Sequence, residues 1–191
     1  MPHALLTSGL HSNGFADWWQ LLSYEHLCRI VANQLARKLR ASGFTKADWA
    51  IGSAYAAIDF SKDVGAALGI PRHGIAEKEQ KEKSKKMLWP RLTIQKSEVV
   101  LQIEELITTR GTLERAREAI NEGNAMKPVE FAPMVGVLFN RSGKDEFEGV
   151  PIVSLIKKNI QNFDPENCPL CKEDSEPIRP KQNWAKLTGK A

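Results

Sequence analysis

Cysteine is scarce in this chain and long apolar runs are missing. The three cysteines, Cys28, Cys168 and Cys171, are too few for a disulfide framework. No apolar stretch reaches the roughly 20 residues that a membrane-spanning helix needs, and the first residues lack the basic region and apolar core of a secretory signal. We therefore expect a protein of a reducing, cytoplasmic compartment with no membrane partner.

A dominant charge of one sign is also missing. The 27 basic and 23 acidic residues leave a net charge of +4, which gives no reason to expect a nucleic-acid partner. Apolar residues make up 42% and charged residues 26% of the 191 positions, as in ordinary globular proteins. This length suits one domain with a small appendage.

Helix-like and strand-like segments alternate between residues 25 and 155. Apolar residues at three- and four-residue steps predict helices at 25–41, 58–68 and 113–122. Short apolar runs predict strands at 47–51, 72–76, 99–103, 133–140 and 150–155. This alternation is typical of an α/β fold with a mostly parallel central sheet flanked by helices. We expect a core of residues 21–163 and a cap, or hood, formed by 1–20 and 164–191.

The most informative stretch begins with the predicted strand at 99–103. Glu104 and Glu105 come directly after it, and a hydroxyl-rich turn at 108–112 opens the next helix. The carboxyl end of a strand is where open α/β sheets bind ligands. Carboxylates accept hydrogen bonds from sugar hydroxyls or from water on Mg²⁺, and the turn offers N–H groups to a phosphate. The pattern predicts a sugar phosphate ligand; the alternative is an ordinary strand–turn–helix with surface carboxylates.

A basic segment at residues 76–91 lies between two predicted strands. It has six basic and three acidic residues and few apolar ones, so we expect a mobile, solvated loop. Beside a phosphate site such a loop suits a lid over a diphosphate. A solvated loop without function is the alternative.

Residues 98–119 resemble the phosphoribosyl diphosphate (PRPP) motif of the type I phosphoribosyltransferases. That motif has a hydrophobic strand, two acidic residues, two aliphatic residues and a Thr/Gly-rich phosphate loop. The chain departs from this motif at Glu105, where the family usually has Asp, and at Arg110, where it usually has a small residue. The Arg110 side chain either crowds the 5′-phosphate or adds a contact to it. The resemblance implies a type I phosphoribosyltransferase fold. It also implies that PRPP is held by Ser53, Ala54, Glu104, Glu105, Thr108, Thr109, Arg110, Gly111 and Thr112.

Three further segments resemble orotate phosphoribosyltransferases. Residues 6–15 are similar to the opening signature, which implies that Ser8, Gly9 and Phe15 contact the pyrimidine. Residues 77–81 are similar to the catalytic loop, although its leading Arg is Glu77 here and its His-Gly pair is missing. Residues 136–141 are similar to the segment that reaches the orotate carboxylate; Arg141 matches, and Asn140 replaces the usual Asp.

The family resemblance implies transfer of the phosphoribosyl group from PRPP to orotate, giving orotidine 5′-monophosphate and pyrophosphate. It implies Mg²⁺ bound with PRPP, and a homodimer in which a loop lysine acts in the partner's site. Lys78 and Lys81 would stabilise the leaving pyrophosphate, and Thr108 and Arg141 would contact orotate. Two alternatives remain: a non-catalytic relative that binds nucleotides as a regulator, and a phosphoribosyltransferase for another nucleobase.

Cys168 and Cys171 have the two-residue spacing of a zinc ligand pair, but one pair is half a site. Cys28 or a histidine, or a second copy of the chain, would have to complete it. The histidines are His3, His11, His26 and His73. Two inert thiols or a labile disulfide are the alternatives to zinc.

Overall fold

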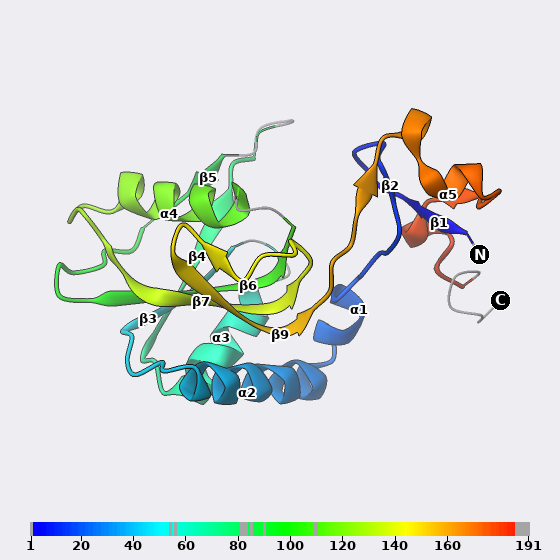
Figure 1. Cartoon of the computed structure of the whole chain (residues 1–191). Helices are drawn as coiled ribbons and strands as arrows, with labels where there is room; N and C mark the ends of the chain where they lie inside the picture. The colour runs from blue at the N-terminus through cyan, green and yellow to red at the C-terminus, as the bar shows by residue number, and fades with distance from the viewer. Residues whose placement is uncertain are drawn as a thin grey trace. The chain divides into compact units, whose positions relative to one another are not determined.

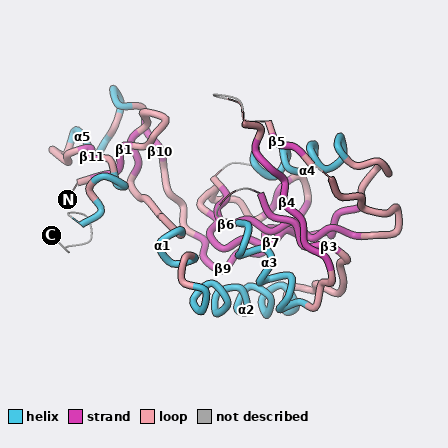
Figure 2. Tube along the Cα trace, turned by 180° about the vertical axis from the view of Figure 1, so that it is seen from behind, coloured by secondary structure: helices cyan, strands magenta, loops and turns pink. Residues whose placement is uncertain are grey.

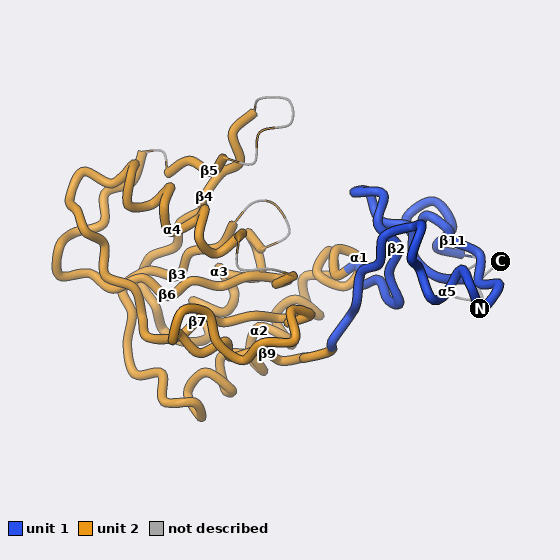
Figure 3. Tube along the Cα trace, turned by 45° about the horizontal axis from the view of Figure 1, so that its top comes forward, with its two compact units in different colours: residues 1–17, 159–191 blue, residues 18–158 orange. Residues whose placement is uncertain are grey.

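The structure is a computed structural model that describes residues 2–53, 55, 57–80, 84, 86–89, 91–108 and 111–185. The chain divides into two compact units (Figure 3). The large unit is Trp18–Lys158, and the small unit combines Met1–Asp17 with Asn159–Ala191.

A seven-stranded sheet forms the centre of the large unit, in the order β5-β4-β3-β6-β7-β9-β8 (Figure 2). The five inner strands, β4, β3, β6, β7 and β9, are parallel, and the short edge strands β5 and β8 are antiparallel to their neighbours. The predicted α/β fold with a mostly parallel sheet is therefore confirmed. The strands are β3 (Trp49–Ser53), β4 (Arg72–Lys78), β5 (Met87–Leu88), β6 (Val99–Ile107), β7 (Glu130–Asn140), β8 (Glu146–Phe147) and β9 (Val150–Lys157).

Helices cover both faces of this sheet (Figure 1). The helices α2 (Glu25–Ala41) and α3 (Ala57–Leu68) pack together on one face, and α4 (Gly111–Gly123) lies on the other. A short helix, α1 (Trp19–Leu22), precedes α2. No helix in the described part of the chain is long and apolar enough to cross a bilayer.

The end of α2 follows from its sequence. Gly43 has a φ of +94°, which glycine adopts without the strain that a Cβ would bring. The N–H of Phe44 donates to the carbonyl of Leu39, and the N–H of Gly43 donates to that of Arg40. This pair of bonds is a Schellman motif, and it stops the helix where the Ser42-Gly43 pair predicts.

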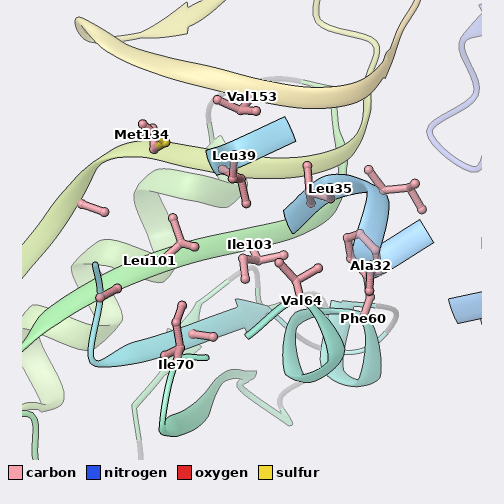
Figure 4. Close-up of a cluster of buried hydrophobic side chains, with 14 of the residues drawn as sticks. Ala32, Leu35, Leu39, Phe60, Val64, Ile70, Leu101, Ile103, Met134 and Val153 are labelled. Atoms are coloured by element: carbon pink, nitrogen blue, oxygen red, sulfur yellow. The ribbon is translucent and has the colours of Figure 1, made fainter. Parts of the chain in front are cut away.

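The largest apolar cluster lies between the sheet and the α2–α3 layer (Figure 4). Leu35 and Leu39 of α2 and Phe60 of α3 are fully buried there against Leu101 and Ile103 of β6. Truncating a fully buried leucine of this kind to alanine typically costs about 2–5 kcal/mol. The cluster fixes β6, the strand that carries the predicted carboxylates.

Two strands extend further than the sequence predicted, at the carboxyl ends of β6 and β4. The strand expected at 99–103 continues to Ile107, because Leu106 and Ile107 pair with Phe139 and Asn140 of β7. Glu104 and Glu105 therefore lie inside a strand and not after it. The strand expected to end at residue 76 continues to Lys78, which pairs with Met87 in an antiparallel hairpin with β5. The start of the expected mobile loop is thus regular sheet.

The small unit holds a four-stranded sheet in the order β10-β2-β1-β11. Its strands are β1 (His3–Leu5), β2 (His11–Ser12), β10 (Asn162–Phe163) and β11 (Pro177–Ile178). The parallel pairing of β1 with β11 joins the two ends of the chain, and the other pairs are antiparallel. The helix α5 (Pro169–Lys172) and two 3₁₀ turns, η1 (Pro165–Asn167) and η2 (Pro180–Gln182), complete this unit.

Candidate active site at the carboxyl edge of the sheet

The order of the strands reverses beside β3. The chain passes from β3 to β4 on one side, and then returns to β6 on the other side and continues to β7 and β9. Open α/β sheets bind their ligands at the carboxyl ends of the strands beside such a reversal. Ser53 is the last residue of β3, and its neighbour Gly52 is in register with Ile103 of β6. Ser53 and Glu104 therefore meet at the expected place.

Glu104 is the central carboxylate of this edge. Its Oε2 accepts a hydrogen bond of 2.5 Å from Ser53 Oγ, and its Oε1 accepts one of 3.3 Å from Gln102 Nε2. Burial of the side chain, which is 3% exposed, raises the pKa of Glu104 to about 7 against the pull of these two bonds. The charge of Glu105 adds to the rise, and that of Lys78 opposes it. A carboxyl group with this pKa changes its charge near neutral pH.

The polar contacts continue inward from Glu104. Arg117 of α4 donates a hydrogen bond of 3.1 Å from Nε to Gln102 Oε1, and its guanidinium lies 4.7 Å from the centre of the Phe131 ring. Burial lowers the pKa of Arg117. Gln102 is thus held at both ends of its amide, so its N–H group is aimed at Glu104. Sequence reasoning missed this link, although a polar Gln102 inside an apolar strand is a signal for it.

Glu104 and Glu105 face opposite sides of the sheet. Successive residues of a strand alternate between faces; Gln102 and Glu104 share the α4 face, whereas Leu101 and Ile103 pack in the α2–α3 cluster. By the same alternation Glu105 lies on the α2–α3 face with Leu101 and Ile103, and it is half-buried. The two adjacent carboxylates therefore do not lie side by side, as a turn after a strand would have allowed.

Gly52 permits a close approach of α3 to the end of β3. A Cβ at this position would lie 2.5 Å from Ser61 Oγ and 2.7 Å from the carbonyl oxygen of Ala57. The absent side chain therefore lets the first turn of α3, which begins at Ala57, pack against the end of β3. Ala54, which was predicted to bind PRPP beside Ser53, lies outside the described residues.

Lys78 ends β4, next to β3 in the sheet. Its side chain is exposed, and its Nζ lies 5.9 Å from the ring centre of Tyr55, in the turn after β3. In the β3–β4 pair Ser53 is opposite Ala76, so Lys78, two residues further along β4, lies at the same edge as Ser53. Lys81, the other predicted catalytic lysine, falls outside the described residues.

The predicted phosphate turn joins β6 to α4. Thr108 is exposed directly after β6, Gly111 and Thr112 begin α4, and Thr109 and Arg110 are not among the described residues. A pocket of about 340 Å³ opens beside Thr108. Its other lining residues are Ile107, Leu113, Ser142, Lys144, Glu146, Phe147, Glu148 and Ile152. The first turn of the 13-residue helix α4 offers N–H groups that suit an anion, whereas the pocket itself carries the acidic Glu146 and Glu148 beside Lys144.

Arg141 follows β7 and is held against the end of β6. Its backbone N–H donates to the carbonyl of Ile107 at 2.9 Å, and its side chain is buried, which lowers its pKa. Asn140 shapes the loop that follows. Its Nδ2 donates to the carbonyl of Lys144 at 2.7 Å, and its Oδ1 accepts from the N–H and hydroxyl of Ser142. An aspartate here could not donate the first of these bonds.

Three predicted pyrimidine contacts belong to the small unit. Ser8 and Gly9 lie in the turn between β1 and β2, which is closed by hydrogen bonds from the N–H of Gly9 to the carbonyl of Leu6 and from the N–H of Leu6 to the carbonyl of Leu10. Phe15 meets Trp184 edge to face, with ring centres 6.4 Å apart. Within the large unit the structure gathers Ser53, Lys78, Glu104, Thr108 and Arg141 on the carboxyl edge of the sheet.

No protein-family model matches the chain, but individual proteins do. It is 32% identical to the orotate phosphoribosyltransferase of Carboxydothermus hydrogenoformans over 178 residues, which cover 93% of this chain and 88% of that protein. It is also 32% identical to the protein of the same name from Caldanaerobacter subterraneus subsp. tengcongensis over 181 residues, which cover 93% and 87%.

Solved structures share the fold. The orotate phosphoribosyltransferase from Aeropyrum pernix matches with a TM-score of 0.58 and 20% identity, over 81% of this chain and 85% of that one. The adenine phosphoribosyltransferase from Thermoanaerobacter pseudethanolicus matches with a TM-score of 0.55 and 17% identity, over 75% and 88%. At these identities the structural likeness shows the type I phosphoribosyltransferase fold and does not separate one nucleobase from another.

Proposed function

The chain belongs to the orotate phosphoribosyltransferase family, and we propose that it transfers the phosphoribosyl group from PRPP to orotate, giving orotidine 5′-monophosphate and pyrophosphate. The observation that carries this proposal is the buried Glu104, held by Ser53 at the reversal of the strand order. A carboxylate there accepts hydrogen bonds from the ribose hydroxyls, beside a helix start for the 5′-phosphate.

In the reaction, the bond from the anomeric carbon to the pyrophosphate oxygen breaks, and a bond from that carbon to a ring nitrogen of orotate forms. The N–H bond of that nitrogen breaks, and its proton passes to the leaving pyrophosphate or to solvent. Glycosyl transfer of this kind passes through an oxocarbenium-like transition state. Negative charge grows on the leaving pyrophosphate, so cations placed there stabilise the transition state more than the ground state. Lys78 lies at the correct edge for this role, and Lys81 is three residues further along the chain.

The remaining roles in the proposal are those that the family resemblance implies. We assign Glu104 and Glu105 to the ribose hydroxyls, each from its own face of β6, and Ser53 and Ala54 to the pyrophosphate. The turn of residues 108–112, Arg110 included, holds the 5′-phosphate. Arg141 pairs with the orotate carboxylate, and Thr108 contacts the rest of that substrate. For Ser8, Gly9 and Phe15 a pyrimidine contact is what the family resemblance implies.

Magnesium suits the donors of this edge. A buried carboxyl group whose pKa is about 7 becomes an anion when a cation or a hydroxyl donor approaches it. Mg²⁺ prefers oxygen ligands and keeps several waters, which a carboxylate such as Glu104 can orient. When bound with PRPP, Mg²⁺ neutralises charge on the leaving pyrophosphate.

The proposal includes a homodimer in the cytoplasm. Large apolar side chains are exposed on α1 and at the start of α2: Trp19 at 55%, Tyr24 at 58% and Ile30 at 55%. Such residues support burial against a second copy. The three cysteines are free thiols, which suits a reducing compartment. Light scattering on the purified chain tests the dimer, and a monomer at assay concentrations would contradict it.

One assay tests the activity. The purified chain is incubated with PRPP, Mg²⁺ and orotate, and the loss of orotate absorbance is followed, with adenine, guanine, hypoxanthine and uracil as parallel substrates. We expect turnover of orotate alone, because only orotate offers a carboxylate to Arg141. Turnover of a purine instead would indicate another nucleobase, and binding of PRPP without any turnover would indicate a non-catalytic regulator.

A further inference from the structure

Two histidines and two cysteines converge in the small unit. The ligand atoms of His3, His11, Cys168 and Cys171 all lie within 4.8 Å of one another. We propose that these four side chains bind one Zn²⁺ ion in a tetrahedral site that fastens the two ends of the chain together. The site takes no part in the transfer reaction, so it stands independently of the proposed function.

Four of the distances between the ligand atoms lie within about 0.4 Å of those expected for a tetrahedron around zinc. Zn–N bonds of about 2.0–2.1 Å and Zn–S bonds of about 2.3 Å place two nitrogens about 3.3 Å apart, and a nitrogen and a sulfur about 3.6 Å apart. His3 Nε2 lies 3.0 Å from His11 Nδ1. His3 Nε2 lies 3.7 Å from Cys168 Sγ and 3.6 Å from Cys171 Sγ, and His11 Nδ1 lies 3.2 Å from Cys171 Sγ.

The fold brings the four ligands together from both ends of the chain. His3 begins β1 and His11 begins β2, and Leu5 is opposite His11 in this antiparallel pair. His3 and His11 are therefore diagonal neighbours on one face of the sheet, and their ring centres are 4.8 Å apart. Cys168 directly precedes α5, and Cys171 lies in its single turn. The two-residue spacing thus places both sulfurs at the same point.

A further side chain orients one ligand. His3 Nδ1 lies 2.9 Å from Ser175 Oγ. With Nε2 bound to a metal, Nδ1 carries the ring proton and donates it to this hydroxyl. Metal-bound histidines nearly always make such a second hydrogen bond, which fixes the ring and its tautomer. Ser175 follows α5, the same segment that carries both cysteines, so the contact ties His3 to that segment.

The small unit needs such a fastening because it has little apolar core. Among its described residues, the buried apolar side chains are Ala4, Ile178, Pro180 and Cys168 itself. All four apolar clusters that the structure describes belong to the large unit. Domains of this size commonly depend on a metal or on disulfides for stability. His3 and His11 are each only 6% exposed, so the cluster lies largely out of contact with water.

The cluster also identifies the residues that complete the zinc ligand pair of Cys168 and Cys171. Cys28 lies in α2 of the large unit and is not among the four clustered ligands, and His26 and His73 likewise belong to the large unit. The remaining histidines, His3 and His11, provide the other half within one chain. Cys168 and Cys171 form no disulfide, so both sulfurs are available to bind zinc as thiolates.

Metal content of the full-length chain tests the site. The protein is produced with zinc in the medium, purified without a metal-chelating tag, and measured by mass spectrometry of the metal. We expect about one zinc per chain. The double variant Cys168→Ser/Cys171→Ser should lose it. Cys28→Ala and His26→Ala are the matched controls, because they remove a cysteine and a histidine elsewhere, and each should keep it. The proposal is overturned if the wild type binds no zinc after zinc is added to it. It is also overturned if the double variant retains zinc.

A second measurement on the wild type does not depend on the folding of variants. Cobalt in place of zinc should give the strong visible absorption of a tetrahedral site with thiolate ligands. Chelation should open residues 1–17 and 159–185 to protease and leave the large unit protected, and added zinc should reverse this. Octahedral cobalt spectra, unchanged protection after chelation, or a mass lower by two hydrogens from a Cys168–Cys171 disulfide in the reductant-free protein would each contradict the site.

Discussion

Ser53 at the end of β3 donates a hydrogen bond of 2.5 Å to the buried carboxyl group of Glu104 on β6. These residues lie 51 positions apart in the sequence and meet because β3 and β6 are neighbours in the parallel sheet. The bond holds one oxygen of Glu104, and Gln102 holds the other. A carboxylate fixed at both oxygens needs little rearrangement when a ribose binds, which is how preorganised sites gain affinity.

The first prediction concerns this bond. Ser53→Ala removes a donor from a buried carboxylate, and a hydrogen bond to a charged group is worth about 1.5–3 kcal/mol. We expect PRPP to bind roughly 10- to 100-fold more weakly, measured by calorimetry with Mg²⁺ present. Ser61→Ala is the control, since Ser61 is a buried serine bonded to His73 and the carbonyl of Ile58. Equal PRPP affinity in wild type and Ser53→Ala would show that the bond is structural only.

The second prediction concerns pH. The pKa of Glu104 is raised from 4.5 to about 7 in the folded chain, so between these values the folded state binds more protons than the unfolded state. The free energy of unfolding should therefore decrease as the pH rises from 4.5 to about 7, on the order of 3 kcal/mol from this group, and then level off. Denaturant titrations of wild type and Glu104→Gln isolate the effect. Identical pH slopes for the two proteins would contradict the raised pKa.

The same group should make PRPP binding depend on pH. The ribose hydroxyls need the ionised form of Glu104 as their acceptor, so affinity should rise as the pH passes through about 7. Glu104→Gln should bind weakly and without this rise. A rise that persists in Glu104→Gln would assign the dependence to PRPP itself or to another group.

The fold could be predicted from the sequence in larger part than the site could. The apolar periods and the Ser-Gly pair after α2 predict the parallel sheet and the end of that helix, because both depend on residues close in the chain. The burial of Glu104 could not be predicted, since it results from the pairing of β3 with β6. The end of β6 at Ile107 likewise depends on its pairing with β7.

Contacts between distant segments account for the other differences. Lys78 belongs to a strand because β5 pairs with it, and a charged sequence gives little sign of that hairpin. The spacing of Cys168 and Cys171 predicts half of a metal site. His3 and His11 join these cysteines only because β1 pairs with β11, which connects the two ends of the chain.

The third prediction concerns Lys78. Removing a cation that stabilises the leaving group should lower kcat by roughly 100-fold in Lys78→Ala, with little change in the melting temperature because the side chain is exposed. Lys86→Ala is the matched control: Lys86 belongs to the same basic segment, but its Nζ lies 3.9 Å from Glu122 of α4. The kcat values of the two variants are measured by steady-state kinetics. An unchanged kcat in Lys78→Ala would remove this lysine from the mechanism.

The last prediction concerns Arg141. Its pairing with the orotate carboxylate is a charge-assisted contact, and its loss should cost about 2–4 kcal/mol in orotate binding. Because Arg141 is buried, Arg141→Ala also risks loosening the end of β7. Arg141→Lys keeps the charge without the planar fork, so it should fold normally and bind orotate with intermediate affinity. The two affinities are measured separately, for orotate and for PRPP. A larger loss for orotate supports the pairing, whereas equal losses in both variants would show that Arg141 acts only through the fold.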